Sequence, residues 1–262
     1  MAPQTASTDT NPVPVVIVTG GASGIGLACA QLLAEEGHRI AIWDIDAAKA
    51  ESAASSISNE TGGEIIGLGV DVAKLEQITN AIESTRAKLG KISGLVHAAG
   101  VTGVSPIEQL TEDVWSMVMD INLRSWPFII KGILDDLKSS PGAALVSISS
   151  INATLGNAMN PTYSASKAGL LGINRALADD LAQYGIRINS VSPGQILTPM
   201  IEAAVNSSPA VKDSFEARIM MGRMGEPREV ATAVKFLLSS DASYITGTEL
   251  VVDGGNIPSQ RC

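Results

Sequence analysis

The feature that most constrains this chain is a regular alternation of short apolar runs with longer helical patterns, starting near residue 13. The runs that read as strands are VPVVIVTG, HRIAIWDI, EIIGLGVD, ISGLVHAAG, AALVSISS, IRINSVSPG and TELVVDGG. Helices are predicted between them, near residues 24–36, 46–60, 74–89, 111–138, 161–184 and 226–239. This order predicts a parallel sheet with helices on both faces. The expected fold class is therefore α/β: a single doubly wound domain around a central seven-stranded parallel sheet.

The domain boundaries follow the same pattern. Residues 1–12 are polar and are expected to form a flexible tail, whereas 13–262 form the single domain. The interval 197–222 has no clear pattern and is too long for a routine connection, so we expect a substrate flap there. An apolar content of 45% with only 3% aromatics indicates a core of Ala, Val, Ile and Leu, which suits buried parallel strands.

Charge and composition exclude several classes of protein. The net charge of −9, without any block rich in Lys or Arg, argues against nucleic acid as a partner. No uncharged apolar run approaches the roughly 18 residues that span a bilayer, and the first residues do not resemble a signal peptide. We therefore expect a cytoplasmic protein with no membrane partner. Two cysteines, Cys29 and Cys262, and two histidines are too few for a disulfide framework or a credible metal site.

A glycine-rich turn, TGGASGIG, follows the first predicted strand. Glycines at such a turn allow a pyrophosphate to approach the backbone and let the helix pack closely on the strand. The N-terminus of the following helix adds free N–H groups and a partial positive charge. The turn therefore predicts a dinucleotide site. Its expected cofactor contacts are Gly20, Ser23, Gly24, Ile25 and Gly26.

Asp44 ends the second predicted strand, 18 residues past Gly26, where an acidic residue should bind the adenosine ribose. The alternative is that Asp44 caps the helix that follows. A 2′-phosphate at ~4 Å from this carboxylate would be repelled by about 4 kcal/mol at an effective dielectric near 20. The neighbours Ile45 and Asp46 supply no compensating cation. The sequence therefore favours NAD over NADP, with Asp44 and Ile45 as contacts.

The stretch NPTYSASKAGL places Tyr163 in the first turn of a predicted helix, with Lys167 one turn later on the same face. Asn160 and Pro161 are suited to the N-cap and first helical position. A phenol that exchanges a proton near pH 7 needs its pKa lowered by about 3 units, or roughly 4 kcal/mol. An ammonium at ~4 Å contributes about that much. The pair therefore predicts an acid–base catalyst.

Together these motifs resemble the short-chain dehydrogenase/reductase family, in its shorter-chain branch, from Val13 to Gly255. TGGASGIG is similar to the T-G-x-x-x-G-x-G of that branch and does not fit the T-G-x-x-G-x-x-G of the longer one. Further matches are DV at 71–72, AAG at 98–100, Asn122, Ser150, Tyr163 with Lys167, PGQILTP at 193–199, and GRMGEPREVA with ITGTELVVDGG. The resemblance implies a Rossmann-type fold, an NAD(P)-linked oxidoreductase and a homotetramer.

The resemblance also implies the roles of individual residues. Ser150 would bond the substrate oxygen, Tyr163 would exchange the proton, and Lys167 would also hold the nicotinamide ribose. Asn122 would hold a water that links Lys167 to solvent, unless it is a buried polar residue satisfied by the backbone. The remaining implied cofactor contacts are Asp71 and Val72 near the adenine, then His97, Ala98, Ala99, Gly100, Pro193, Gly194, Ile196 and Thr198.

His97 stands where the family often has an asparagine, and Ala98 replaces a second one. Because His97 ends a buried strand, we expect a packed, hydrogen-bonded histidine rather than a catalytic base. The substrate is expected to contact residues after the fifth strand and in the flap. These are Ser150, Asn152, Leu155, Asn157, Tyr163 and Met200.

Three functional hypotheses remain at this stage. The leading one is an NAD-dependent dehydrogenase of a small secondary alcohol or ketone, such as a sugar-derived alcohol, a polyol or a hydroxy acid. The second is a 3-oxoacyl thioester reductase acting on acyl-carrier protein, against which Asp44 and the aspartate pairs at 135–136 and 179–180, expected to be solvated, weigh. The third is an NAD-binding sensor without catalysis.

Overall fold

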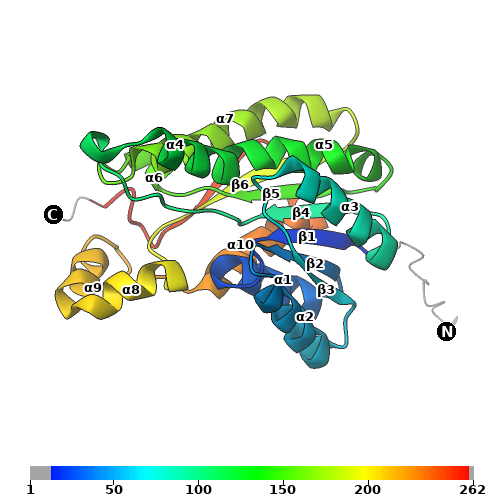
Figure 1. Cartoon of the computed structure of the whole chain (residues 1–262), viewed down its shortest axis with the longest axis horizontal. Helices are drawn as coiled ribbons and strands as arrows, with labels where there is room; N and C mark the ends of the chain where they lie inside the picture. Colours follow the sequence, from blue (N-terminus) through cyan, green and yellow to red (C-terminus); the bar gives the residue numbers. More distant parts are fainter. Residues whose placement is uncertain (1–12, 260–262) are drawn as a thin grey trace, which may run out of the picture.

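A seven-stranded parallel sheet organises the computed structural model, which describes residues 13–259; the predicted tail at 1–12 lies outside the described residues. The strand order is β3-β2-β1-β4-β5-β6-β7, and every neighbouring pair is parallel. The strands are β1 Val15–Thr19, β2 Arg39–Asp44, β3 Ile65–Gly69, β4 Gly94–His97, β5 Ala144–Ile148, β6 Arg187–Pro193 and β7 Glu249–Val252. The predicted α/β fold class and sheet are confirmed (Figure 1).

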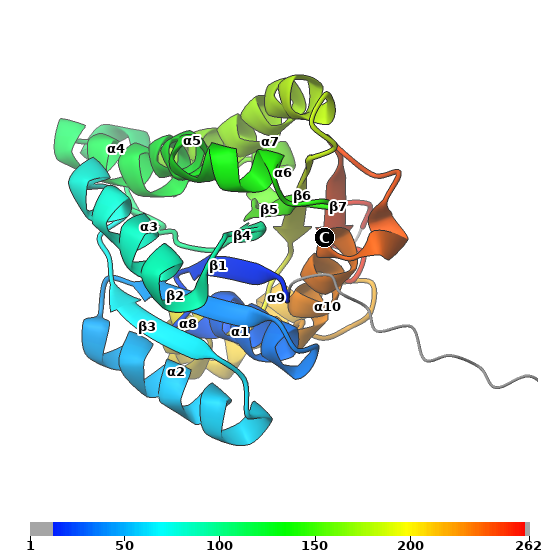
Figure 2. The same ribbon diagram turned by 90° about the vertical axis from the view of Figure 1, so that its right-hand side faces the viewer.

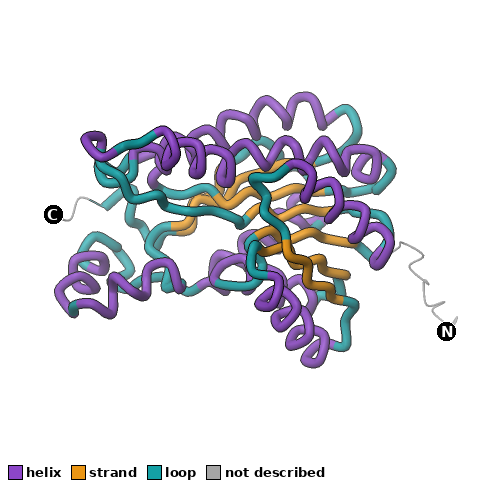
Figure 3. The backbone as a smooth tube through the Cα atoms, viewed as in Figure 1, coloured by secondary structure: helices purple, strands orange, loops and turns teal. Residues whose placement is uncertain are grey.

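Helices cover both faces of the sheet. In Figure 3 the orange strands lie between two layers of purple helices. On one face lie α3 Leu75–Leu89, α4 Glu112–Met119, α5 Ser125–Lys138 and α7 Pro161–Ala182. On the other lie α1 Gly24–Glu35, α2 Ala47–Thr61 and α10 Pro227–Leu238. Two short 3₁₀ turns span Ile107–Gln109 and Ser240–Ala242.

Alternation along each strand divides the interior into two cores. In β1, Val15 and Ile17 pack in the core that includes α3, α5 and α7, whereas Val16 and Val18 pack in the core that includes α1, α2 and α10. Both faces of the central strands are thus buried, whereas the edge strands β3 and β7 are partly exposed, which explains why the central strands read as continuous apolar runs. Trp43 and Trp126 are fully buried in the first core.

The carboxyl ends of all seven strands point to one edge, because every pair is parallel. The strand order reverses between β1 and β4, so their connections leave the sheet in opposite directions and open a crevice there. In Figure 2 the strands of the two halves fan out to either side of β1 and β4. A ligand site is expected at this edge.

The interval 197–222 is more ordered than the sequence reading implied. It contains two helices, α8 Pro199–Ser207 and α9 Pro209–Glu216, each with proline in its first turn. They project from the carboxyl edge and pack through a small cluster of Val205, Ile219 and Met224 (Figure 1). The predicted flap is therefore helical; each helix is too short for its periodicity to stand out.

The helix predicted at 111–138 is found, but it contains a π-helical turn. The structure has α4, then a π-helical turn at Asp120–Arg124, then α5. Asn122 lies inside this turn and is fully buried. A turn with one extra residue shifts the helix face that follows, and such turns often occur at functional sites. A further short helix, α6 Asn152–Leu155, follows β5.

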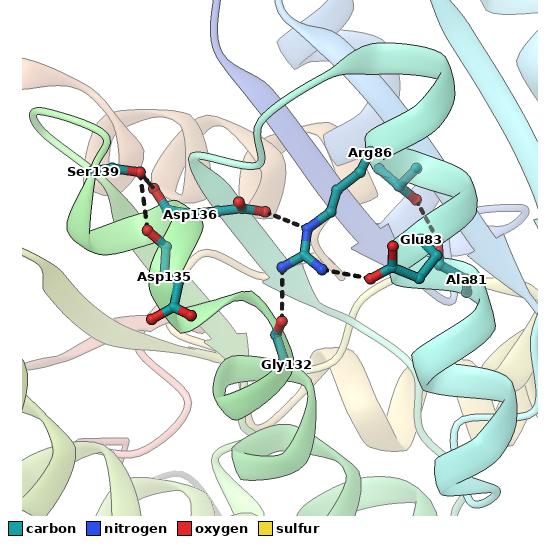
Figure 4. A network of polar contacts seen from close by, with 8 residues as sticks. Ala81, Glu83, Arg86, Gly132, Asp135, Asp136 and Ser139 are labelled. Carbon is teal, nitrogen blue, oxygen red and sulfur yellow. Dashed lines mark hydrogen bonds and ion pairs between the residues drawn. The ribbon is translucent and has the colours of Figure 1, made fainter.

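Arg86 of α3 forms hydrogen bonds and an ion pair with residues of α5 (Figure 4). Its guanidinium donates to Asp136 at 2.8 Å, to the Gly132 carbonyl at 2.9 Å and to Glu83 at 2.6 Å. Asp136 is therefore an ion-pair partner and not the solvated residue expected from the sequence. No helix within residues 13–259 is long and apolar enough to cross a bilayer.

Candidate active site

A cavity of about 350 Å³ opens at the carboxyl edge of the sheet, between the two halves of the fold. Most of the residues predicted for cofactor or substrate line it. They are Gly20, Ser23, Gly24, Ile25, Gly26, Asp44, Ile45, Asp71, Val72, Ala98, Ala99, Gly100, Ser150, Tyr163, Lys167, Pro193, Gly194, Ile196, Thr198 and Met200. Residues from the ends of six strands therefore converge on one space.

Five predicted residues lie outside this lining as the described chain defines it: His97, Asn122, Asn152, Leu155 and Asn157. The lining also includes residues that the sequence reading missed, mostly apolar neighbours of the predicted ones. These are Trp43, Val70, Val101, Ile121, Ile148, Ser149, Pro199 and Ile201. The only signal that could have found them is their place next to the ends of strands.

The glycine turn is packed so closely that only glycine fits. A side chain at Gly26 would overlap the carbonyl oxygen of Gly20. Gly20 itself has φ +63°, and a Cβ there would lie 2.8 Å from the backbone of Ala99. The turn after β1 therefore rests directly on the loop after β4. The first turn of α1, which starts at Gly24, faces the same cavity, as a phosphate cradle requires.

Asp44 faces the cavity and is held by two backbone amides. Its Oδ2 accepts from the N–H of Ala22 and its Oδ1 from the N–H of Asp46, each at 3.2 Å. The helix-cap alternative is excluded, because Asp46 is the N-cap of α2 and accepts from the N–H of Lys49. Lys49, a cation of this region, is paired with Asp46 at 3.1 Å. The Asp44 carboxylate thus stands fixed at the end of β2 where a ribose diol can reach it.

Tyr163 lies in the first turn of α7, which starts at Pro161 as predicted. Asn160 occupies the N-cap position, but its side-chain oxygen has no partner among the described residues. The Tyr163 phenol and the Ser150 hydroxyl both line the cavity, and Ser150 acts on the pKa of the phenol. Burial raises the pKa of Tyr163, and Ser150 opposes that rise. The expected lowering of this pKa is therefore not met.

Lys167 lies one turn further along α7 and is almost completely buried. Its Nζ donates to the Ile148 carbonyl at 2.8 Å and lies 5.5 Å from the centroid of the Tyr163 ring. Burial lowers the pKa of Lys167 to about 8. The ammonium is thus charged at neutral pH and sits close to the phenol, but its hydrogen bond goes to the strand.

Both polar atoms of the Asn122 side chain form hydrogen bonds with other residues of the protein. Its Oδ1 accepts from the Val101 N–H at 2.9 Å, and its Nδ2 donates to the Val101 carbonyl at 3.0 Å and to the Ser166 hydroxyl at 3.1 Å. This matches the alternative of a buried polar residue satisfied largely by the backbone. The side chain holds the loop after β4 against α7, so Asn122 acts here as a positioning residue.

His97 requires a correction, since it points away from the cavity. Its Nδ1 is 2.9 Å from the Thr19 hydroxyl, its Nε2 is 3.3 Å from the Ser125 hydroxyl, and its ring stacks on Trp126 at 5.4 Å. Burial lowers its pKa to about 3, with the Lys167 charge a smaller cause. His97 is therefore the neutral, packed histidine that the sequence predicted, and the cofactor contact assigned to it is withdrawn. Alternation at the end of β4 directs its side chain toward the α5 layer.

Within residues 13–259, no cluster of three or more His, Cys, Asp or Glu side chains is arranged to hold a metal ion. Cys29 is buried in α1, and burial raises the pKa of its thiol to about 12. It is therefore an inert core residue rather than a nucleophile. The ionisable groups of the cavity are the acids Asp44 and Asp71 with the Tyr163–Lys167 pair. Such a set is suited to proton exchange beside a bound dinucleotide.

Comparisons with known proteins agree with this geometry. The family profile described as "Enoyl-(Acyl carrier protein) reductase" matches residues 20–256. The chain is 36% identical to 3-oxoacyl-[acyl-carrier-protein] reductase FabG of Chlamydia muridarum, over 91% of this chain and 95% of that protein. It is 34% identical to cyclopentanol dehydrogenase of Comamonas sp., over 92% and 96% of the two chains.

Two solved structures are similar over nearly the whole fold. The crystal structure of gox2181 matches with a TM-score of 0.89 and 35% identity, covering 94% of this chain and 96% of the other. Levodione reductase matches with a TM-score of 0.87 and 32% identity, covering 92% and 96%. With the profile covering most of the chain and these relatives covering nearly all of it, the chain belongs to the short-chain dehydrogenase/reductase family of oxidoreductases.

Proposed function

We propose that this oxidoreductase is an NAD-dependent dehydrogenase of secondary alcohols, with Tyr163 as its acid–base residue. One observation carries the proposal: a single cavity is lined by the glycine turn, by Asp44 and by the Ser150, Tyr163 and Lys167 side chains. A dinucleotide cradle and a proton-exchanging phenol are the two components that hydride transfer to or from a carbinol carbon requires. The cradle and the phenol come from different parts of the chain, and they meet at the carboxyl edge of the sheet.

The lining residues fit a nicotinamide dinucleotide. The space left by Gly20 and Gly26 and the start of α1 would hold the pyrophosphate, because a side chain there would fill the cradle. Asp44 would bind the adenosine ribose, with Asp71 and Val72 beside the adenine. Ile196 and Thr198, from the loop after β6, would hold the nicotinamide end. When bound, the oxidised nicotinamide supplies the hydride acceptor and a positive charge.

The choice of NAD over NADP rests on charge. The Asp44 carboxylate is fixed by the amides of Ala22 and Asp46 and cannot easily turn away from a 2′-phosphate. Repulsion at ~4 Å is about 4 kcal/mol at an effective dielectric near 20. The nearby cation Lys49 is engaged with Asp46. These facts support NAD as the cofactor.

Ser150, Tyr163 and Lys167 would have separate roles in the transfer of the proton. The Ser150 hydroxyl and the Tyr163 phenol would bind the alcohol oxygen, and the phenolate of Tyr163 would accept the hydroxyl proton as the carbon loses hydride. Lys167, 5.5 Å from the ring, stabilises the phenolate by at most about 3 kcal/mol at an effective dielectric of 20. Burial raises the pKa of Tyr163, and the positive charge that an oxidised nicotinamide would bring is expected to favour the phenolate.

A second enzymatic candidate is a 3-oxoacyl thioester reductase, which the names of the bacterial FabG relatives favour. Asp44 weighs against it where NADPH is the donor. The third candidate, a sensor that binds NAD without turnover, is disfavoured because Ser150, Tyr163 and Lys167 converge in one cavity. A binder has no need of a buried proton donor.

We also propose a homotetramer that works in the cytoplasm. The support for association is a set of exposed apolar side chains on α4 and α5: Trp115, Met117 and Phe128, which are 44%, 42% and 40% exposed. Sedimentation of the purified protein at micromolar concentration tests this assembly. A monomer at that concentration would contradict it.

The dehydrogenase proposal is tested by absorbance at the NADH band across a panel of secondary alcohols, with NAD or NADP. Tyr163→Phe should lower kcat by about 10²–10⁴-fold while leaving the Kd for NAD nearly unchanged. Tyr184→Phe, beyond the far end of the same helix and against Lys138, is the matched control and should retain activity. No turnover with any alcohol, or equal turnover in Tyr163→Phe, would contradict the proposal.

A further inference from the structure

An apolar rim, as we name it, gathers at the carboxyl edge of the sheet, where the catalytic cavity opens. Its members are large apolar side chains that the fold leaves exposed at the carboxyl edge: Val104 (65%), Leu155 (53%), Met159 (53%), Leu197 (40%), Met200 (55%), Met220 (47%) and Met221 (66%). They come from the segments that follow β4, β5 and β6 and from the end of the flap. In Figure 1 the α6 segment and the flap helices α8 and α9 lie at the same end of the sheet.

Backbone contacts join the parts of this rim. The Ser105 N–H donates to the Met159 carbonyl at 3.0 Å, which places the loop after β4 beside the loop after α6. The Met221 N–H donates to the Gly254 carbonyl at 3.1 Å, which ties the end of the flap to the segment after β7. Met200 lines the cavity itself. Through Met200 the rim therefore reaches the cavity in which Tyr163 lies.

The segments that build the rim carry no charge over long stretches. Residues 98–107, 143–166 and 188–201 contain no Asp, Glu, Lys or Arg. A site for a carboxylate or phosphate normally offers a cation, since burying an unpaired anion is costly. In the described part of the flap, Lys212 pairs with Glu216 at 3.8 Å and Arg223 with Glu229 at 2.7 Å. Arg218, which is exposed, is the flap cation outside these pairs.

Two of the polar residues predicted to contact the substrate, Asn152 and Asn157, lie outside the cavity lining of the described chain. Asn157 lies outside the cavity lining of the described chain, and its Oδ1 accepts from the Met159 N–H at 2.9 Å within a turn. Asn152 also lies outside that lining, and its N–H donates to the Ser150 hydroxyl at 3.1 Å. The cavity lining of the described chain therefore lacks the two asparagines expected to bind the hydroxyl groups of a polyol.

We infer that the substrate is an uncharged secondary alcohol or ketone with an apolar body, which the apolar rim covers. This inference rests on the proposed dehydrogenase function and names its substrate class. Burial of the hydrocarbon body supplies the binding energy, whereas the Ser150 and Tyr163 hydroxyls supply the polar contacts at the reacting oxygen. Four of the seven rim residues are methionine, whose flexible side chain adapts to different shapes. The site therefore accepts several apolar bodies rather than one.

A chain-length series tests the substrate class directly. kcat/KM is measured with NAD for straight-chain 2-alkanols from four to eight carbons, for 3-hydroxy acids of the same lengths, and for tetritols and pentitols. Each added methylene should raise kcat/KM for the alkanols by up to about fourfold until the rim is filled, as expected for burial of one CH₂. The acids and polyols should be at least about tenfold poorer than the alkanol of equal length, as expected when a charge or hydroxyl meets an apolar site.

A variant in the cavity wall and control variants elsewhere test whether the rim causes the dependence of kcat/KM on chain length. Met200→Gln places an amide in the cavity wall and should flatten the dependence of kcat/KM on the length of the alkanol. Tyr244→Ser, at a fully exposed tyrosine outside the rim, is the control and should leave the series unchanged. Arg218→Ala should also leave it unchanged.

The outcomes separate this inference from the function on which it rests. Turnover of acids or polyols in preference to alkanols, or an acid activity that Arg218→Ala abolishes, would overturn the apolar substrate class and leave the dehydrogenase proposal intact. A chain-length dependence that Met200→Gln leaves steep would overturn the role of the rim. Absence of turnover with every compound would instead contradict the dehydrogenase proposal itself.

Discussion

The two sides of the cavity are built on different principles. On the cofactor side, Gly20 lies so close to Ala99 that no Cβ fits, and Asp44 is held by two amides. On the substrate side, the flap helices α8 and α9 pack through a small cluster of Val205, Ile219 and Met224, and methionines are exposed. The first side is fixed by backbone contacts between strands, whereas the second is held by a few side chains.

This difference separates what must stay constant from what can vary. The dinucleotide is the same in related enzymes, so its cradle can be rigid and can bind through backbone groups. Substrates of related enzymes differ, and a lightly packed helical flap can change without disturbing the sheet. The comparison predicts that substitutions on the cofactor side are severe and those in the flap are mild and local.

The largest effect is expected from Gly26→Ala. The new methyl group would overlap the Gly20 carbonyl, so the turn must open and affinity for NAD should fall by more than about 1,000-fold, beyond what one lost contact costs. Gly172→Ala is the matched control, because Gly172 lies in α7 with open space around its Cβ position. It should stabilise the chain by about 0.5–1 kcal/mol. Isothermal titration with NAD and thermal unfolding measure both, and wild-type affinity in Gly26→Ala would break the comparison.

A smaller effect is expected from Asp44→Ala. Removing the carboxylate deletes both the ribose partner and the repulsion of a 2′-phosphate, so the preference for NAD over NADP should fall by about 100-fold. The ratio of kcat/KM values for the two cofactors measures it. Glu202→Ala, an exposed acid on α8 of the substrate side, is the control for loss of one negative charge. An unchanged ratio in Asp44→Ala would show that cofactor choice lies elsewhere.

The third prediction concerns the stability of the cofactor side without ligand. The pKa of Lys167 is about 8 in the fold, against 10.5 for the free side chain, so its buried charge costs about 3 kcal/mol at pH 7. Lys167→Met should therefore raise the free energy of unfolding by about 2–3 kcal/mol while abolishing turnover.

The pH dependence of this difference has a definite sign. Between pH 8 and 10.5 the unfolded state binds more protons at Lys167 than the folded state does, so wild-type stability rises with pH relative to the variant. The advantage of Lys167→Met should shrink as pH increases from 8 toward 10. Urea unfolding at pH 7 and pH 9.5 measures it, and a constant difference would contradict the assigned cause.

The smallest effect is expected in the flap. Val205→Ala removes two methyl groups from the small cluster beneath α8 and should raise KM for the substrate by a few-fold, equivalent to about 1 kcal/mol, with the Kd for NAD unchanged. Val234→Ala, in the α10 core, should lower Tm instead and leave KM unaltered. The opposite pattern would show that the flap unfolds with the sheet rather than separately.

The cofactor side of the cavity was easier to predict from the sequence than the substrate side. All seven strands and the main helices were predictable, since buried parallel strands read as apolar runs and caps such as Asn160–Pro161 mark helix starts. The glycine turn and Asp44 were predictable because backbone geometry demands those residue types at that spacing. The residues on the cofactor side can therefore largely be predicted from short sequence motifs.

The substrate side was less predictable for physical reasons. Asn152, Leu155 and Asn157 were placed in the cavity because they follow β5, but the chain turns at α6 and takes them outside the lining that the described residues form. The flap helices are too short for periodicity, and the π-turn around Asn122 leaves no mark in the apolar pattern. His97 lies next to the predicted cofactor contacts Ala98 and Ala99, but alternation along β4 turns its side chain toward Trp126 in the α5 layer.

Isotope transfer tests the central claim most directly. The best alcohol from the panel is deuterated at its carbinol carbon and incubated with NAD and either the wild-type protein or Tyr163→Phe. We predict that the wild type produces reduced nicotinamide carrying the deuterium, and that the variant binds NAD equally well but transfers deuterium at least about 100-fold more slowly. Deuterium lost to water, or transfer in the variant at the wild-type rate, would contradict a hydride transfer that depends on this phenol.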